Sequence, residues 1–242
     1  MPEPAPPIEL AAIDLAGTTV RDDGVVEAAL VEALRAVGAA DPDAADDELR
    51  AFVRRTMGMS KIAVFRDVVG DESRAHEANR IFEAAYARRV ADGQAAAIPG
   101  AEVALSALRE NGIRVAITTG FSSATRDLLL EALGWRGLVD LALSPGAGLR
   151  GRPAPDLVLA AVIRLGVDDV HAVAVVGDTT NDLVCGHRAG AGVLVGVLTG
   201  AHDRATLVDA PHTHLLDSIA ELPETLLGGD REALQAAGAS RF

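Results

Sequence analysis

The chain has 242 residues, of which 49% are hydrophobic, enough to bury a sizeable core as one large domain or a domain with a modest insertion. Its formal net charge of -13, with no run of basic residues, argues against a nucleic-acid partner, because neutralising phosphates requires grouped lysines or arginines. Apolar stretches are interrupted by glycine or charge well before about 18 residues, so we expect no membrane segment. The start lacks a signal-peptide pattern and Cys185 is the single cysteine, which together predict a cytoplasmic protein with this cysteine in its core.

The first predicted element is a buried strand over residues 8–16, which runs into the loop Gly17-Thr18-Thr19. The stretch from about 25 to 92 is wholly helical, with helices expected over 25–37, 43–55, 60–69 and 72–92. After Pro99-Gly100, helices over 101–111, 123–133, 155–165 and 180–189 alternate with strands over 113–119, 139–144, 170–177 and 193–198. This alternation predicts an α/β core, a Rossmann-like parallel sheet covered on both faces, with an all-helical insertion after the first strand. We assign residues 1–21 and 99–242 to the core and 22–98 to the insertion, and expect the tail beyond about 228 to be weakly docked.

Polar residues follow the predicted strands at the points where ligands bind in open parallel sheets. Carboxylates at such an edge form a hard oxygen site suited to Mg²⁺, and hydroxyl, amide and guanidinium groups bind phosphoryl oxygens. One such residue alone is usually a helix cap or a turn residue, but a set at successive strand ends predicts a site for a metal and a phosphate. The set comprises Asp14, Thr118-Thr119-Gly120, Arg152 and the segment Gly177-Asp178-Thr179-Thr180-Asn181-Asp182.

Lys61 is the single lysine among 22 basic residues. An arginine keeps its proton, whereas a desolvated lysine amine can lose its proton and condense with a carbonyl to form a Schiff base. On composition alone, one lysine left by chance in an arginine-biased chain is the simpler interpretation. The residues around Lys61 favour the other interpretation.

Four segments over residues 8–222 resemble the four motifs of the haloacid dehalogenase superfamily: Asp14-Leu15-Ala16-Gly17-Thr18-Thr19, Thr118-Thr119-Gly120, Gly151-Arg152-Pro153 and Gly177-Asp178-Thr179-Thr180-Asn181-Asp182. The resemblance implies the haloacid dehalogenase fold, with the helical insertion as a mobile cap. It implies that Asp14 is the nucleophile and that Mg²⁺ is held by Asp14, the backbone carbonyl of Ala16, and Asp178. Asp182 would orient water molecules on the metal. Thr119, Gly120 and Arg152 would hold the phosphoryl group.

Ala16 stands where phosphatases of this superfamily usually carry an aspartate that acts as general acid and base. The phosphonatase branch, phosphonoacetaldehyde hydrolase, has that alanine and a cap lysine in a Met-Gly-x-x-Lys segment. Its lysine forms an iminium with the aldehyde, so that C–P cleavage leaves an enamine. The segment Met57-Gly58-Met59-Ser60-Lys61 reproduces this pattern. The chain is therefore similar to phosphonatase-like hydrolases, a sister group of the authentic enzyme, with Lys61 in a catalytic role and Met57 and Gly58 in contact with the substrate.

Two positions depart from the authentic enzyme: Val64 replaces a histidine that assists proton transfer, and Gly24 replaces a cysteine. Asp22, Asp23 or His76 are candidates for the missing acid or base. We therefore expect the substrate to be phosphonoacetaldehyde or a related small phosphonate.

Other functions stay open on the sequence. One alternative is a phosphatase that acts on a small phosphate ester without a Schiff base, and another is a non-catalytic phosphate-binding regulatory protein. A carbon–halogen dehalogenase is disfavoured, because that branch works without Mg²⁺ and lacks the arrangement seen here around Asp178. Family analogy also suggests a homodimer formed through the cap. Structural roles are expected for His171, His187, His202, His212 and His214.

Overall fold

Side chains of the central strand alternate between two apolar layers, one on each face of the sheet. In β1 (Leu10–Ile13), Leu10 and Ala12 pack into one layer, and Ala11 and Ile13 pack into the other. All four are fully buried, which explains why the strand is a continuous apolar run. This computed structural model describes residues 6–40 and 46–228, so the tail predicted to be weakly docked lies outside the described residues.

Within the described residues, the sheet has six parallel strands in the order β3-β2-β1-β4-β5-β6. The strands after β1 are β2 (Arg114–Thr118), β3 (Leu141–Leu143), β4 (Val173–Gly177), β5 (Val193–Val197) and β6 (His214–Leu216). Ile13 in β1 is in register with Ile117 of β2 on one side and with Val176 of β4 on the other. The residues that follow β1, β2 and β4 therefore meet at one edge, where the chain order reverses. The predicted parallel α/β sheet is confirmed.

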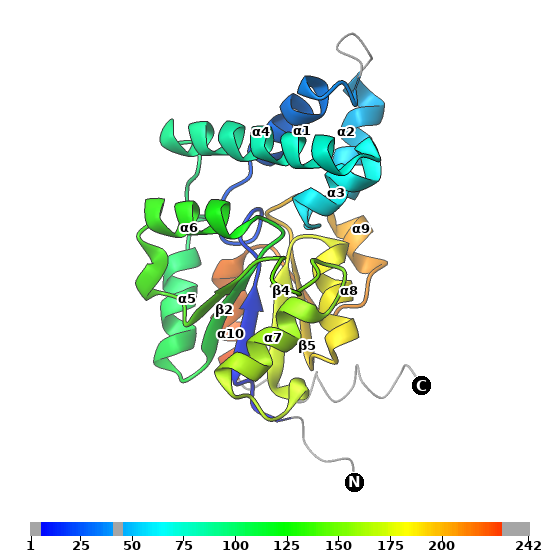
Figure 1. The fold of residues 1–242 in the computed structure, drawn as a ribbon. Helices are drawn as coiled ribbons and strands as arrows, with labels where there is room; N and C mark the ends of the chain where they lie inside the picture. Colours follow the sequence, from blue (N-terminus) through cyan, green and yellow to red (C-terminus); the bar gives the residue numbers. More distant parts are fainter. Residues whose placement is uncertain (1–5, 41–45, 229–242) are drawn as a thin grey trace.

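Helices cover both faces of this sheet (Figure 1). The apolar layer that contains Ile13 includes residues of α5 (Ala101–Glu110), α6 (Ser123–Ala132) and α10 (Leu222–Leu227). The layer that contains Leu10 includes residues of α7 (Asp156–Leu165), α8 (Thr180–Ala189) and α9 (Arg204–Val208). Short 3-10 helices span 135–137, 170–172 and 219–221. Cys185 is buried in the second layer, as predicted.

The core differs from the sequence expectations mainly in its short elements. Residues 170–172, which were predicted to begin a strand, form a 3-10 helix, because the Asp169 carboxylate accepts a hydrogen bond from the His171 amide at 2.8 Å. The strand predicted over 139–144 is confined to β3. The sequence set no bounds for β6, α9 or α10, since elements of three to six residues are too short to show a hydrophobic period.

Between β1 and α5, the regular elements among the described residues are helices: α1 (Val25–Ala36), α2 (Asp46–Arg55), α3 (Lys61–Val69) and α4 (Glu72–Ala91). Helices α1 and α3 both pack against α4. Phe65 of α3 lies 6.2 Å from Phe82 of α4, measured between ring centroids, and Phe82 lies 5.9 Å from Tyr86. Figure 1 shows these helices beyond the carboxyl ends of the strands. The predicted all-helical insertion is thus confirmed, and we refer to it as the cap.

The two chain segments that join the cap to the core run side by side. Val20 pairs antiparallel with Ala97, the Arg21 amide donates to the Ala96 carbonyl at 2.8 Å, and the Ile98 amide donates to the Thr19 carbonyl at 2.9 Å. This linker pair supports the predicted division into a core of 1–21 and 99–242 and a cap of 22–98, which stays a prediction.

The loop between α2 and α3 docks onto the core through backbone contacts. The Lys61 amide donates to the Gly120 carbonyl at 3.3 Å, and the Asn181 side-chain amide donates to the Met57 carbonyl at 2.8 Å. A Cβ atom added to Gly120 would lie 2.3 Å from the Met59 carbonyl oxygen, well inside van der Waals contact. Glycine is therefore required at residue 120 for the cap loop to approach this closely.

We expect Gly120→Ala to loosen this contact. An overlap of this kind costs on the order of 1–3 kcal/mol, so amide hydrogen exchange in residues 56–62 should accelerate about ten-fold or more. The matched control is Gly137→Ala, because an added Cβ there meets no heavy atom within 4 Å. Amide exchange is measured by mass spectrometry. If exchange in residues 56–62 of Gly120→Ala proceeds at the wild-type rate, the contact between Gly120 and the cap loop does not hold that loop in place.

Candidate active site

Asp14 is held rigidly at the end of the central strand. Its amide donates to the Val176 carbonyl at 3.0 Å, and its carbonyl accepts a hydrogen bond from the Thr19 hydroxyl at 3.0 Å. One nitrogen of the Arg152 guanidinium donates to the Asp14 carboxylate at 2.5 Å and to the Thr118 carbonyl at 2.8 Å. Arg152, which lies in the loop before α7, therefore braces Asp14 against the end of β2.

Asp14, Asp178 and Asp182 form a buried cluster in which one carboxylate oxygen of each lies within 4.8 Å of the others. Asp178 accepts hydrogen bonds from the Thr18 hydroxyl at 3.1 Å and the Ala201 amide at 2.7 Å. Asp182 pairs with Arg152 and accepts a hydrogen bond from the Thr179 amide at 3.1 Å, as part of the capping box of α8.

The electrostatics of this cluster fit a bound cation. Burial, and then the charge of Asp14, raises the pKa of Asp178 well above its ordinary value of 3.8. A bound cation would offset both causes, because it would favour the charged form of the buried carboxylate and screen it from Asp14. Carboxylate oxygens are the ligands that Mg²⁺ prefers, and Ala16 lines the same cavity. The residues predicted to bind the metal, Asp14, Ala16 and Asp178, therefore lie together, and Asp182 lies close enough to contribute.

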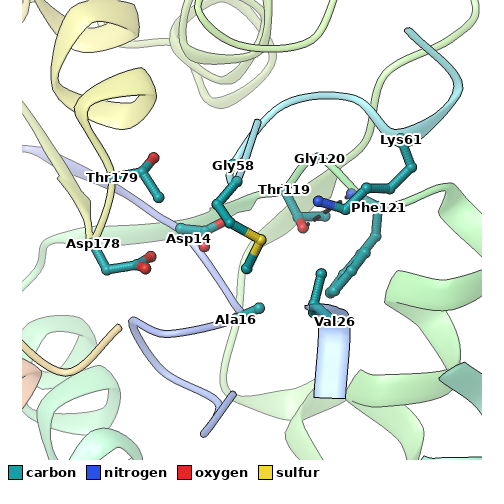
Figure 2. Close-up of a pocket in the computed structure, with 11 residues that line it drawn as sticks. Asp14, Ala16, Val26, Gly58, Lys61, Thr119, Gly120, Phe121, Asp178 and Thr179 are labelled. Atoms are coloured by element: carbon teal, nitrogen blue, oxygen red, sulfur yellow. Dashed lines mark hydrogen bonds between the residues drawn. The ribbon is translucent and has the colours of Figure 1, made fainter. Parts of the chain in front are cut away.

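A small cavity of about 20 Å³ separates the cluster from the cap. This is roughly the space that one water molecule requires, so the cap stands closed over the site. Figure 2 shows Lys61 extending from the cap toward Thr119 and Phe121, with Asp14 and Asp178 on the core side. The lining residues are Asp14, Ala16, Val26, Met57, Gly58, Lys61, Thr119, Gly120, Phe121, Asp178 and Thr179.

Lys61 is buried in the closed site, with 5% of its surface exposed. Its ammonium nitrogen lies 5.9 Å from the centroid of the Phe121 ring. Burial lowers the pKa of Lys61 from its ordinary 10.5 to about 8, against the opposing charges of Asp22 and Asp14. With that pKa, about one amine in ten is neutral at pH 7, and the neutral amine is the form that attacks a carbonyl.

The predicted site residues thus fall into two groups. Residues of the first group line the cavity: Asp14, Ala16, Met57, Gly58, Lys61, Thr119, Gly120 and Asp178. Arg152 and Asp182 form the second group, outside that lining. The Arg152 guanidinium, expected to bind the phosphoryl group, here contacts the carboxylates of Asp14 and Asp182.

Sequence reasoning missed two residues that line the cavity, Val26 and Phe121, and it placed Thr179 in the fourth motif without giving it a role of its own. Phe121 directly follows a motif residue at a strand end, and this adjacency could have identified it. Val26 lies in the first turn of α1 and carried no comparable signal.

None of the histidines among the described residues lines the cavity. His171 bonds to Asp169, and His212 and His214 bond to neighbouring residues near β6. His202 joins the core to the cap: its Nδ1 accepts a hydrogen bond from the Thr180 amide at 3.0 Å, and its Nε2 lies 3.4 Å from the Arg54 carbonyl oxygen.

Residues 8–190 match the family model described as "Hydrolase: haloacid dehalogenase-like hydrolase". The probable phosphatase IndB of Dickeya dadantii is 29% identical over 217 residues, which cover 88% of this chain and 91% of that protein. The phosphonoacetaldehyde hydrolase of Pseudomonas putida is 37% identical over 106 residues, but these cover only 43% of this chain and 38% of that protein.

A solved structure of a phosphonoacetaldehyde hydrolase-like protein from Oleispira antarctica has a TM-score of 0.80 to this chain at 23% identity. The match covers 96% of this chain and 95% of that chain. This likeness shows a shared fold.

We expect Mg²⁺ to raise the thermal unfolding midpoint of the metal-free protein, and to raise it more at about pH 7.5 than at about pH 5. Because the pKa of Asp178 is raised, its carboxyl group holds a proton in mildly acidic solution, and a metal must displace that proton. At a concentration 100-fold above its dissociation constant, the metal should add about 2.7 kcal/mol of stability.

Two variants separate this site from general ion effects. Asp178→Asn should lose most of the stabilisation by Mg²⁺. Asp209→Asn should keep it, because Asp209 is exposed at the end of α9. The unfolding midpoints are measured by differential scanning fluorimetry. If Mg²⁺ raises the midpoint equally in both variants, the metal binds at a site other than Asp178.

Proposed function

The chain belongs to the haloacid dehalogenase-like hydrolases, and we propose that it cleaves the carbon–phosphorus bond of phosphonoacetaldehyde or a related small phosphono-aldehyde. The observation that carries this proposal is a buried lysine of lowered pKa in the same cavity as Asp14. Ala16 lines that cavity where a phosphatase of the superfamily would carry its general acid. A reaction whose leaving group is stabilised by an iminium does not need that acid.

In the proposed reaction, the Lys61 amine condenses with the substrate aldehyde and releases water. An Asp14 carboxylate oxygen then attacks phosphorus, and the electron pair of the breaking C–P bond moves into the iminium to give an enamine. Water next hydrolyses the aspartyl-phosphate to phosphate, and protonation and hydrolysis of the enamine release the aldehyde and the free lysine. Covalent intermediates of this kind divide one difficult displacement into easier steps.

Other residues of this chain would orient the reacting groups. Arg152 holds the Asp14 carboxylate through the bond at 2.5 Å, which fixes the direction from which the nucleophile attacks. Thr119 and Gly120 line the cavity and can donate hydrogen bonds to phosphoryl oxygens. Mg²⁺, which Asp14, the Ala16 carbonyl and Asp178 would hold, supplies positive charge that lets an anionic carboxylate approach an anionic phosphoryl group.

A phosphatase is the second candidate, and the similarity to the probable phosphatase IndB over most of both chains favours it. In that function, Lys61 would bind an anionic substrate rather than form a covalent bond. An activated leaving group would then be required, because Ala16 cannot donate a proton. Membership of a hydrolase family leaves the non-catalytic alternative without support.

Two further proposals concern assembly and location. We propose that the protein forms a homodimer through its cap and works in the cytoplasm. None of the helices in the described part of the chain is long and apolar enough to cross a bilayer.

Borohydride trapping tests the proposed Schiff base. Incubation with phosphonoacetaldehyde and borohydride should inactivate the enzyme and add one covalent mass at Lys61, which intact-protein and peptide mass spectrometry can locate because the chain has no second lysine. The trapping rate should rise as pH increases toward about 8 and level off above it, since the neutral amine accumulates through the pKa of Lys61.

Lys61→Arg is the companion variant, because it keeps the positive charge but cannot form an iminium. Its C–P cleavage should fall by about a thousand-fold or more, while any hydrolysis of p-nitrophenyl phosphate should survive. If the wild type forms no adduct and turns over only phosphate esters, the phosphatase alternative is correct.

A further inference from the structure

Asn181 is a side chain of the core that bonds to the cap. It lies in the first turn of α8, directly before Asp182, and its side-chain amide donates a hydrogen bond to the Met57 carbonyl at 2.8 Å. The start of α8 is itself fixed, because Thr179 and Asp182 form a capping box there. Asn181 therefore extends toward the cap from a rigid base beside the carboxylate cluster.

The Met57 carbonyl belongs to the loop that leads to Lys61. Lys61 is the first residue of α3 and lies only four residues further along the chain. The Met59 amide donates to the Thr56 carbonyl at 3.1 Å, and Gly58 before it adopts a φ of 78°, so the chain turns tightly at this point. In so short and hydrogen-bonded a segment, a contact that holds the Met57 carbonyl also restrains Lys61.

Within the described part of the chain, three hydrogen bonds join residues 54–61 to the core. The bonded pairs are Asn181 with Met57 at 2.8 Å, Lys61 with Gly120 at 3.3 Å, and His202 with Arg54 at 3.4 Å. The first is the shortest, and donor–acceptor distances above about 3.2 Å are longer than those of most N–H···O bonds. Asn181 therefore makes the best of the three contacts between this part of the cap and the core.

The contact with Met57 requires a donor at residue 181. A backbone carbonyl can only accept a hydrogen bond, so the NH₂ group of Asn181, and not its oxygen, faces Met57. Met57 is buried, and the loop lies directly on the start of α8, since a Cβ atom added to Gly58 would lie 2.5 Å from the Thr179 hydroxyl oxygen. Removing the donor from such a closely packed place leaves the carbonyl without its partner, which costs free energy.

The environment of Lys61 depends on where this loop lies. Lys61 is buried, and its ammonium nitrogen lies 5.9 Å from the centroid of the Phe121 ring, which belongs to the core. Figure 2 shows Gly58 and Lys61 above Asp14 and Asp178 in that view. If the loop moved away from α8, the ammonium would regain contact with water, which favours its charged form.

We propose that Asn181 is the positioning residue for Lys61: by holding the Met57 carbonyl, its side chain keeps the lysine over the buried carboxylate cluster. Helix α8 then places both sides of the site, because it carries Asp182 on the core side and Asn181 toward the cap. The role concerns the place of the amine. It therefore applies whether Lys61 forms a Schiff base or binds an anionic substrate.

The test measures the pKa of Lys61 by NMR titration in wild type, Asn181→Leu and Asn181→Ala. Reductive methylation with ¹³C-formaldehyde labels the single lysine and the α-amine, and the signal missing from Lys61→Arg identifies the lysine. Leucine keeps roughly the size of asparagine and alanine does not, but both lack the donor and neither adds charge. In both variants the pKa of Lys61 should rise toward its ordinary 10.5, so that the neutral fraction at pH 7 falls about five-fold or more.

Amide hydrogen exchange in residues 56–62 is the second measurement, and it should accelerate about ten-fold or more in both variants. The matched control is Asn111→Leu, because the Asn111 side chain also donates to a backbone carbonyl at 2.8 Å, but at the exposed end of α5 within the core. This control should match the wild type in both measurements. The rise in the pKa of Lys61 should appear with and without Mg²⁺, which separates it from a change in metal binding.

A wild-type pKa of Lys61 in either Asn181 variant, once circular dichroism shows that the variant is folded, would overturn the role of Asn181, whether or not exchange in the loop accelerates. The same conclusion follows if Asn111→Leu shows an equal rise, or if the rise appears only with Mg²⁺. Neither measurement uses the aldehyde. A failed borohydride trapping experiment would therefore overturn the proposed Schiff base and leave this inference standing.

Discussion

The structure depends on one electrostatic constraint: three carboxylates are buried together at the edge of a parallel sheet. Like charges in a poorly solvated site repel strongly, and removing each of them from water is costly. Arg152 offsets part of this cost by contacting both Asp14 and Asp182. Further partners are the Thr18 hydroxyl from the loop after β1, the Thr179 amide at the start of α8 and the Ala201 amide from the loop after β5. The carboxylates come close together because β1 lies between β2 and β4 in the sheet. A bound cation would neutralise part of their combined charge.

The cap completes this arrangement from the opposite side. With its loop between α2 and α3 docked against Gly120, Lys61 lies in a cavity with room for about one water molecule. The same desolvation lowers the pKa of Lys61. The contact that buries Lys61 therefore also activates its amine, because removal from water favours the neutral form.

Much of the fold could be predicted from the sequence, because long apolar runs and glycine breaks mark the larger elements. The site could be predicted in outline for a related reason: parallel strands end at the same edge, so Asp14, Thr119 and Asp178 had to converge. Asp22 and Asp23 could not be separated in this way. They are adjacent residues of one type, yet Asp22 accepts a hydrogen bond from the Val26 amide at the start of α1, whereas Asp23 is exposed and pairs with Arg21. The contact of Arg152 with two carboxylates likewise depends on distances that no spacing in the sequence encodes.

The loop between α2 and α3 meets the core largely through its own main-chain atoms, and this affects how the protein could change over evolution. The cap contributes the Met57 and Met59 carbonyls to these contacts, so the contacts themselves do not depend on which side chains those two residues carry. Shape selection inside the cavity then falls to a few apolar side chains, Val26, Met57 and Phe121. A lineage could acquire a new substrate by exchanging these three residues, while the contact between cap and core and the reactive groups are inherited unchanged.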